Sequence, residues 1–252
     1  MNILITNDDG IDAIGMIELA KAMTKVGNVY VVAPDSQKSA TGHAITVHNP
    51  IISKERYIRE DIKAYAISGT PADCVKVGIE GILKDIEIDI IVSGINNGSN
   101  LGTDVIYSGT VSAAIEGFVQ NKPSIAVSYN EFDVDEETYR KAAKYIVEIV
   151  DNIKDKMDIF KEGILNINIP NEIIKGYKIT TLGERKYENG IEERISPRGE
   201  KYYWIAGTIK ELNQREDSDI TAIKEGYISI TPVNIDMTNF KEIERLKSIK
   251  LL

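Results

Sequence analysis

The chain has few of the residues that would commit it to disulfide, zinc or membrane chemistry. Its 252 residues include a single cysteine, Cys74, and two histidines. One cysteine excludes a disulfide within the chain and fits a reducing compartment, and no group of Cys and His has the spacing of a tetrahedral zinc site. No stretch approaches the roughly 20 apolar residues of a membrane-spanning helix. Asp8 and Asp9 stand where a signal peptide needs its apolar core, so we expect a soluble, cytoplasmic protein.

Basic residues are also scarce. The 30 Lys and Arg are outnumbered by 39 Asp and Glu, which gives a formal net charge of -9. This balance argues against a non-specific nucleic-acid surface and against a surface for anionic membranes. It leaves room for a small anionic substrate, provided that a metal ion or a helix N-terminus supplies positive potential locally. The chain is also long enough to bury a sizeable core.

Over the first two thirds of the chain, short β-branched runs alternate with longer helical patterns. This order predicts an α/β fold with a mostly parallel sheet covered by helices. A capping-box pattern, Thr70 to Asp73, starts one of these helices, and Gly27 suits the position just after another. We expect strands at 3–6, 29–33, 64–67, 88–92, 124–128 and 164–169, and helices at 11–26, from 71, at 111–119 and at 136–153.

The pattern changes after Gly176. A charged, hairpin-like stretch with strands at 177–182 and 202–205 has little core of its own and is expected to lean on another surface. A strand at 227–231 and a helix at 237–249 follow. We therefore divide the chain into a catalytic core (1–176), an extended β-hairpin arm (177–210) and a C-terminal strand and helix (211–252) that return to the core or to a partner subunit.

The most informative local feature is the pair of adjacent carboxylates, Asp8 and Asp9, directly after the first strand. Side by side in a low-dielectric cleft they repel each other unless a cation or a hydrogen-bond donor compensates. In open α/β sheets, ligands bind outside the carboxyl ends of the strands. The pair therefore indicates a divalent metal site, although a plain strand-to-helix loop in which Asp9 caps the helix gives the same pattern.

Two further loops follow predicted strands, at 35–42 and 93–110, and in a parallel sheet all three loops meet at one edge. Mg²⁺ and Mn²⁺ prefer carboxylate, amide and hydroxyl oxygens. Asp8 and Asp9 offer carboxylates, Ser39 a hydroxyl and Asn96 an amide oxygen. We predict that these four residues can converge on one ion.

Ser108, Gly109 and Thr110 open the helix at 111–119. Free N–H groups at a helix start form a cradle for phosphate, and the two hydroxyls add donors. An ordinary N-cap explains most such sequences, but the Gly/Asn-rich loop before it is longer than a connection needs. A metal beside a phosphate cradle indicates metal-assisted phosphoryl hydrolysis, with either water or a carboxylate such as Asp8 as the nucleophile.

The chain resembles the SurE family, the stationary-phase survival proteins, over nearly its full length. The motifs that carry the resemblance are Ile5-Thr6-Asn7-Asp8-Asp9-Gly10-Ile11, Ala33-Pro34-Asp35 with Gln37 and Ser39, Gly69-Thr70-Pro71-Ala72-Asp73-Cys74, Ser93-Gly94-Ile95-Asn96-Asn97-Gly98, Gly102-Thr103-Asp104, Tyr107-Ser108-Gly109-Thr110-Val111, and Pro197-Arg198-Gly199 with Tyr202-Tyr203-Trp204.

The resemblance implies a Rossmann-like three-layer α/β/α domain and a 5′- or 3′-nucleotidase that hydrolyses nucleoside monophosphates. It implies one Mg²⁺ or Mn²⁺ per subunit, and a homodimer or homotetramer built by exchange of the C-terminal arm. The implied site residues are the metal ligands Asp8, Asp9, Ser39 and Asn96, of which Asp8, Asp9 and Asn96 are also catalytic, and the phosphate-binding residues Asn97, Ser108, Gly109 and Thr110.

Two alternatives stay open at this point. A haloacid-dehalogenase-type phosphatase requires Asp-x-Asp after the first strand, whereas here Asp8 and Asp9 are adjacent. A non-catalytic sensor that binds a nucleotide or a metal could use the same edge of the sheet.

Overall fold

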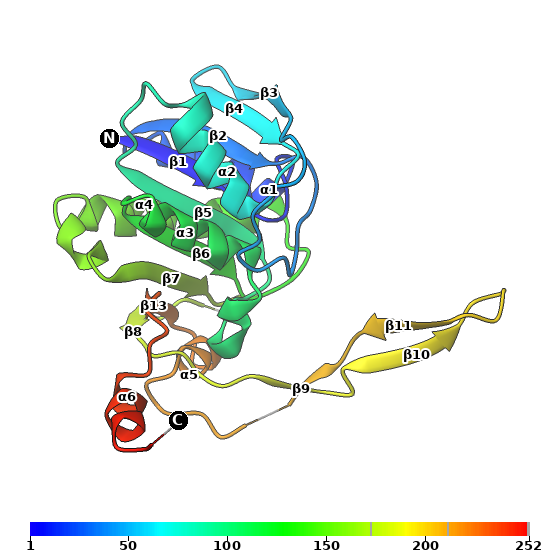
Figure 1. Ribbon diagram of the computed structural model, residues 1–252. Coiled ribbons are helices and arrows are strands. Elements are labelled where there is room, and N and C mark those ends of the chain that lie inside the picture. The colour runs from blue at the N-terminus through cyan, green and yellow to red at the C-terminus, as the bar shows by residue number, and fades with distance from the viewer. Residues whose placement is uncertain (172, 211, 251–252) are drawn as a thin grey trace.

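The computed structural model describes residues 1–171, 173–210 and 212–250. Residues 211, 251 and 252, which belong to the predicted C-terminal segment, lie outside the described residues. The core is one nine-stranded sheet (Figure 1), and this confirms the predicted α/β class. In spatial order its strands are β3 (Ser53–Arg59), β4 (Ile62–Ile67), β2 (Asn28–Pro34), β1 (Asn2–Thr6), β5 (Ile90–Asn97), β6 (Ser124–Tyr129), β7 (Gly163–Ile169), β13 (Ile228–Asn234) and β8 (Tyr177–Ile179).

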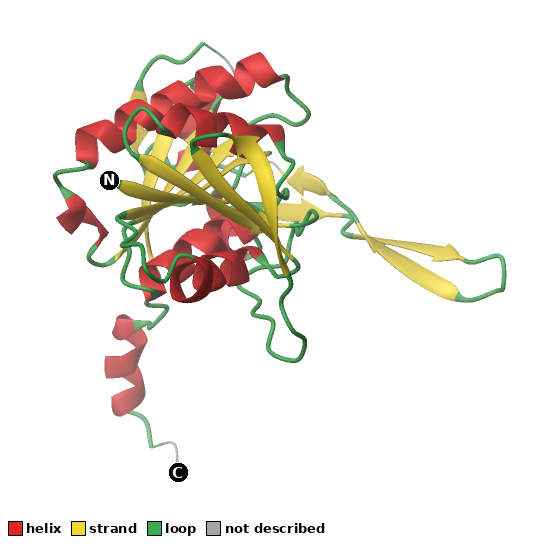
Figure 2. Ribbon diagram, turned by 90° about the horizontal axis from the view of Figure 1, so that it is seen from above, coloured by secondary structure: helices red, strands yellow, loops and turns green. Residues whose placement is uncertain are grey.

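The six strands from β4 to β7 run parallel, whereas β3 and β13 are antiparallel to their inner neighbours. Helices cover both faces of the sheet (Figure 2), which gives three layers. Successive side chains of a strand point to opposite faces. Ile3 and Ile5 of β1 accordingly pack with one pair of helices, and Leu4 packs with the other. The first pair is α1 (Ile14–Met23) and α4 (Glu136–Ile153), and the second is α2 (Pro71–Val77) and α3 (Gly109–Val119).

Local signals predicted several boundaries correctly. Thr70 caps α2, with its side chain accepting from the Asp73 N–H and the Asp73 side chain accepting from the Thr70 N–H. Ser108 caps α3 through a 3.1 Å hydrogen bond from the Val111 N–H. Cys74 is fully buried. Short helical turns at Gly78–Ile82, Gly102–Ile106 and Met157–Phe160 complete the helices of this part of the chain.

Several expectations about element boundaries were wrong. The first helix begins at Ile14 rather than at 11, because the Ile11 N–H donates to the Pro34 carbonyl at 2.8 Å and holds this turn against β2. Gly27 is not a left-handed cap; a Cβ there would lie 2.2 Å from the Met1 carbonyl oxygen, so glycine is required by close backbone approach. Strand β5 continues to Asn97, whereas we expected it to end at Val92.

The C-terminal third supplies β8 and β13 to the sheet, and between these two strands the chain leaves the sheet as an arm. The expectation of a hairpin strand at 177–182 was wrong, because Tyr177–Ile179 is β8 and pairs with β13. The shorter elements here are β9 (Lys186–Glu188), β10 (Ile191–Ile195), β11 (Lys201–Ile205), β12 (Thr208–Lys210), α5 (Asp219–Lys224) and α6 (Phe240–Lys247). Strands β10 and β11 form an antiparallel hairpin that projects from the body of the protein (Figure 1). Trp204 and Ile205 in this hairpin are 58% and 90% exposed. Among the described residues, no helix is long and apolar enough to cross a membrane.

Candidate active site

The carboxyl ends of β2, β1 and β5 lie next to one another in the sheet. These strands are parallel neighbours, with β1 in the middle. The loops that follow them, which begin at Asp35, Asn7 and Gly98, therefore emerge at the same edge. The structure confirms this convergence.

Asp8 is the centre of the arrangement. Its side chain is only 4% exposed, and the Thr110 hydroxyl donates to its Oδ1 across 102 positions of sequence. A Cβ on Gly109 would lie 2.7 Å from the Asp8 Cβ and 2.9 Å from Oδ2. Glycine at 109 is therefore what lets the start of α3 approach the carboxylate. The first turn of α3 faces Asp8, and its positive dipole end favours the ionised form.

Burial, with a smaller contribution from the charge of Asp9, nevertheless raises the pKa of Asp8 to about 6 from an ordinary value of 3.8. Hydrogen bonds from Thr110 lower the pKa of Asp8, but by less than burial raises it. Asp8 is thus a carboxylate whose negative charge is incompletely compensated by the protein. A cation placed beside it would supply the missing compensation.

Asp9 is held by the end of β5. Its Oδ2 accepts a 2.9 Å hydrogen bond from the Asn97 N–H. Burial raises the pKa of Asp9, against the lowering effects of the Asn97 N–H and the Gln37 side chain. Asp9 therefore contacts both neighbouring loops, and it does not act simply as a helix cap, because α1 begins after Ala13 with no side-chain cap.

An irregularity in β5 sets the positions of Asn96 and Asn97. Between Ser93 and Asn96 the strand advances three residues while β6 advances two, which is a β-bulge. Gly94 within it has φ 137°, and a Cβ there would lie 2.2 Å from the Val127 carbonyl oxygen. The Asn96 amide NH₂ donates to the Gly98 carbonyl at 2.7 Å, which leaves the amide oxygen as an acceptor.

Ser39 lies in the loop after β2, which is tied to the acidic pair at two points. The Lys38 N–H donates to the Asp8 carbonyl at 2.7 Å, and the Gln37 side chain, which lowers the pKa of Asp9, donates to the Ser39 hydroxyl oxygen at 3.0 Å. The structure therefore places Ser39 and Asn96 next to residues that contact Asp8 or Asp9. It records no direct hydrogen bond from either of them to the pair.

These groups fit a hard divalent cation. Two carboxylates with raised pKa values, a hydroxyl and an amide oxygen are the donor types that Mg²⁺ and Mn²⁺ select. Within the described part of the chain, no group of three or more His, Cys, Asp or Glu is arranged to hold a metal. Neutral oxygens such as those of Ser39 and Asn96 would therefore have to complete the site.

The predicted phosphate-binding residues occupy the same edge, with one difference from expectation. The Thr110 hydroxyl, which we expected to point to a phosphate, donates to Asp8 instead. The Ser108 hydroxyl oxygen accepts from the Val111 N–H, so its proton remains available. Asn97 holds Asp9 through its backbone and turns its amide toward a different loop.

That loop, which follows β6, carries residues that sequence reasoning missed. The Asn97 amide oxygen accepts from the Asp133 N–H at 2.8 Å, and the Asn97 NH₂ donates to Asp133 Oδ1 at 3.2 Å. The Tyr139 hydroxyl also donates to the Asn97 amide oxygen, at 3.3 Å. Burial raises the pKa of Tyr139 to about 12, so it stays a donor. The sequence offered one signal for this loop: it follows another predicted strand of the parallel sheet, and loops after parallel strands emerge at the same edge.

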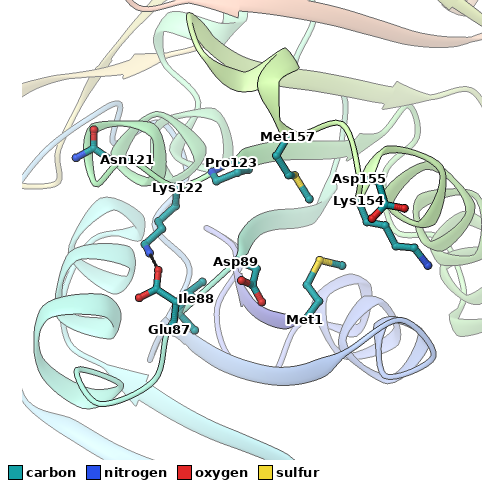
Figure 3. Close-up of a pocket in the computed structure, with 10 residues that line it drawn as sticks. All are labelled: Met1, Glu87, Ile88, Asp89, Asn121, Lys122, Pro123, Lys154, Asp155 and Met157. Atoms are coloured by element: carbon teal, nitrogen blue, oxygen red, sulfur yellow. Dashed lines mark hydrogen bonds and ion pairs between the residues drawn. The ribbon is translucent and has the colours of Figure 1, made fainter.

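A cavity of about 470 Å³ lies at the opposite edge of the sheet (Figure 3). Its lining comes from segments that precede the strands, including Met1, Asp89 and Pro123, and it contains the ion pair between Lys122 and Glu87. Parallel α/β sheets bind ligands at the carboxyl edge, because the helix N-termini point there. The acidic pair, and not this cavity, is therefore the candidate functional site.

The fold and the site together define a three-layer, Rossmann-like α/β protein with an acidic pair, Asp8 buried and Asp9 half-buried, at the carboxyl edge of its sheet. Comparison with known families matches residues 3–189 to the family described as Survival protein SurE. The chain belongs to the SurE family.

Relatives match over the whole chain. A protein named 5′-nucleotidase SurE from Alkaliphilus metalliredigens (strain QYMF) is 49% identical, with 100% of this chain and 99% of the relative covered. A protein also named 5′-nucleotidase SurE, from Petrotoga mobilis, is 46% identical, with 98% of each chain covered. Among solved structures, the SurE protein from Aquifex aeolicus superposes with a TM-score of 0.84 at 39% identity, covering 98% of this chain and 99% of that one.

Proposed function

We propose that this protein is a divalent-metal-dependent nucleotidase that hydrolyses nucleoside 5′-monophosphates to nucleoside and phosphate. The observation that carries the proposal is the pair of the buried Asp8 and the half-buried Asp9, anchored by Thr110 and by the Asn97 N–H. Full-length relatives named 5′-nucleotidase SurE support the same activity. A haloacid-dehalogenase mechanism is not favoured, because its Asp-x-Asp pattern is absent from this loop.

In this proposal Asp8, Asp9, Ser39 and Asn96 hold one Mg²⁺ or Mn²⁺. When bound, such a cation polarises the phosphoryl group and acidifies the attacking water. The chain's own contribution is positioning. Thr110 fixes the orientation of the Asp8 carboxylate, and the Asn97 N–H fixes that of Asp9.

Phosphate recognition is assigned to Asn97 and to the segment from Ser108 to Thr110. Ser108 lies at the N-cap of α3 and keeps a hydroxyl proton to donate. The helix dipole directs positive potential to the same place, where it stabilises the extra negative charge of a phosphoryl transition state. The absence of a Cβ at Gly109 makes room for Asp8, and in this proposal it also lets the phosphate approach the backbone.

Phosphate release from adenosine 5′-monophosphate tests the activity. Wild type should release phosphate with Mn²⁺ and stop when excess chelator is added. Asp9→Asn should be nearly inactive, whereas Asp12→Asn, which removes an exposed charge three positions away, should retain activity. Binding of the nucleotide without turnover would favour a non-catalytic sensor, and turnover that persists in chelator would contradict the role of the metal.

We also propose that the protein forms a homo-oligomer through the arm. The β10–β11 hairpin carries exposed apolar side chains, including Ile191, Tyr203 and Ile205, and packs against little of its own chain (Figure 1). A two-stranded hairpin is marginally stable in water alone, so a second subunit is the expected support.

A further inference from the structure

A second cavity, of about 310 Å³, borders Asp9 on the α1 and α4 side of the sheet. Its size is at the lower end of the range for small-molecule sites, about 300–1,000 Å³. It combines polar groups with an apolar wall, as such sites do. The polar lining consists of Asp9, Gln37, Asn97, Asp133 and Tyr139, and the remaining lining of Ala13, Ile14, Gly15 and Val134.

Asp133 is held in a fixed relation to Asp9 across this cavity. Asn97 joins them: its N–H donates to Asp9 Oδ2 at 2.9 Å, and its amide pairs with the Asp133 N–H and Oδ1. Asp133 has φ 54°, a left-handed conformation that Asp and Asn adopt more readily than other residues with side chains. The hydrogen bonds with Asn97 therefore hold the Asp133 carboxylate at the cavity, although the residue is exposed.

The Asp133 carboxylate retains an acceptor for a ligand. Oδ1 accepts from the Asn97 NH₂, while Oδ2 accepts from no donor among residues 1–171, 173–210 and 212–250. A charged acceptor with a fixed direction selects a ligand that has hydroxyl donors. The proposed substrates carry such donors on the sugar, one ester link away from the phosphate that we assign to Asn97 and the segment from Ser108 to Thr110.

We propose that this cavity is the ribose subsite, and that Asp133 accepts a hydrogen bond from the 2′-hydroxyl of the nucleotide. The inference rests on the proposed function and adds a preference for ribonucleotides over 2′-deoxyribonucleotides. Ile14 and Val134 supply the apolar surface for the carbon face of the sugar. Because Asn97 contacts both carboxylates, the sugar is recognised at a set position relative to the site of hydrolysis.

The test compares kcat/KM for adenosine 5′-monophosphate and 2′-deoxyadenosine 5′-monophosphate. A hydrogen bond to a charged group is worth about tenfold or more, so wild type should prefer the ribonucleotide by at least about tenfold. Asp133→Asn keeps a carbonyl oxygen for the Asn97 NH₂ and tolerates the left-handed backbone, but replaces the free acceptor with a donor. It should lose activity toward the ribonucleotide and little toward the deoxyribonucleotide.

Asp135→Asn is the matched control. Asp135 caps α4 by accepting from the Thr138 N–H at 2.9 Å and does not line the cavity, and Asn preserves a cap. This variant removes the same charge two positions away and should keep the wild-type preference. Binding of the products adenosine and 2′-deoxyadenosine, measured by calorimetry, should show the same pattern without any turnover.

Equal kcat/KM for the two nucleotides in wild type would overturn the inference. So would an equal loss for both nucleotides in Asp133→Asn, since that would mean that Asp133 acts only on Asp9 through Asn97. If wild type hydrolyses neither nucleotide, the proposed function fails. The ribose subsite is then tested by the calorimetric binding measurements alone. Adenosine binding that is no tighter than 2′-deoxyadenosine binding would then refute it.

Discussion

The raised pKa of Asp8 leads to a prediction about stability that is independent of catalysis. Its folded-state value is about 6, against an ordinary value of 3.8. At 1.36 kcal/mol per pH unit, keeping this buried side chain ionised in the metal-free protein costs about 3 kcal/mol of unfolding free energy. The folded state binds the proton more tightly than the unfolded chain does. Stability due to this group is therefore greatest below pH 3.8 and is lost as the pH rises through about 6.

Urea unfolding of chelator-treated protein between pH 4 and 8 measures this effect. Other carboxyls, such as Asp61 and Asp135, have lowered pKa values and work in the opposite direction. The decisive quantity is therefore the difference between wild type and Asp8→Asn, which lacks the titrating group. We expect the stability of the variant relative to wild type to increase by up to about 3 kcal/mol as the pH rises from 4 to 8. Asp12→Asn should follow wild type.

Saturating Mn²⁺ should abolish this penalty in wild type, because a cation favours the ionised carboxylates. The urea concentration at the midpoint of unfolding at pH 8 should then rise in wild type and stay nearly unchanged in Asp8→Asn. Parallel pH profiles for wild type and Asp8→Asn without metal would refute the reasoning, since the cost would then arise elsewhere.

Three further predictions concern single features. Asp9→Asn should remove nearly all Mn²⁺-supported phosphate release while circular dichroism shows an intact fold; substantial turnover in the purified variant would contradict the site. Gly109→Ala should lower kcat roughly a hundredfold, since its Cβ would displace Asp8 from 2.7 Å, whereas Gly81→Ala, with its nearest atom at 3.8 Å, should not; equal rates would exclude a positioning role. Replacing residues 191–205 with a short turn should reduce the mass measured by light scattering; an unchanged oligomer would count against the arm.

Much of the fold was predictable because its local and global signals agree. The helix at Glu136–Ile153 follows its apolar period and begins at a capping Asp135, and sequence reasoning placed both its ends correctly. Strand β3 was missed because Ser53–Arg59 is a charged edge strand with no alternating apolar pattern, and only pairing with β4 defines it. The end of β5 was misjudged because its Gly and Asn residues are typical of a loop, whereas pairing with β6 keeps them extended.

The candidate site was predictable to the level of which loops meet. The expectation of a parallel sheet and the acidic pair were enough to predict that the loops carrying Asp8, Ser39 and Asn96 emerge at one edge. The hydrogen-bond partners of Asp8 and Asp9 could not be predicted, because Thr110 and Asn97 are separated from the pair by about a hundred residues of chain. Asp133 had no local signal at all, since its role depends on a reciprocal contact with Asn97.

The most direct test of the central claim is a crystal structure of the protein soaked with Mn²⁺ and a nucleoside monophosphate, with anomalous scattering recorded for manganese. We predict one anomalous peak within about 2.0–2.4 Å of oxygens from Asp8 and Asp9, with Ser39 and Asn96 in the same coordination sphere and the phosphate beside Ser108. Manganese bound away from Asp8 and Asp9, or no anomalous peak at saturating Mn²⁺, would contradict it.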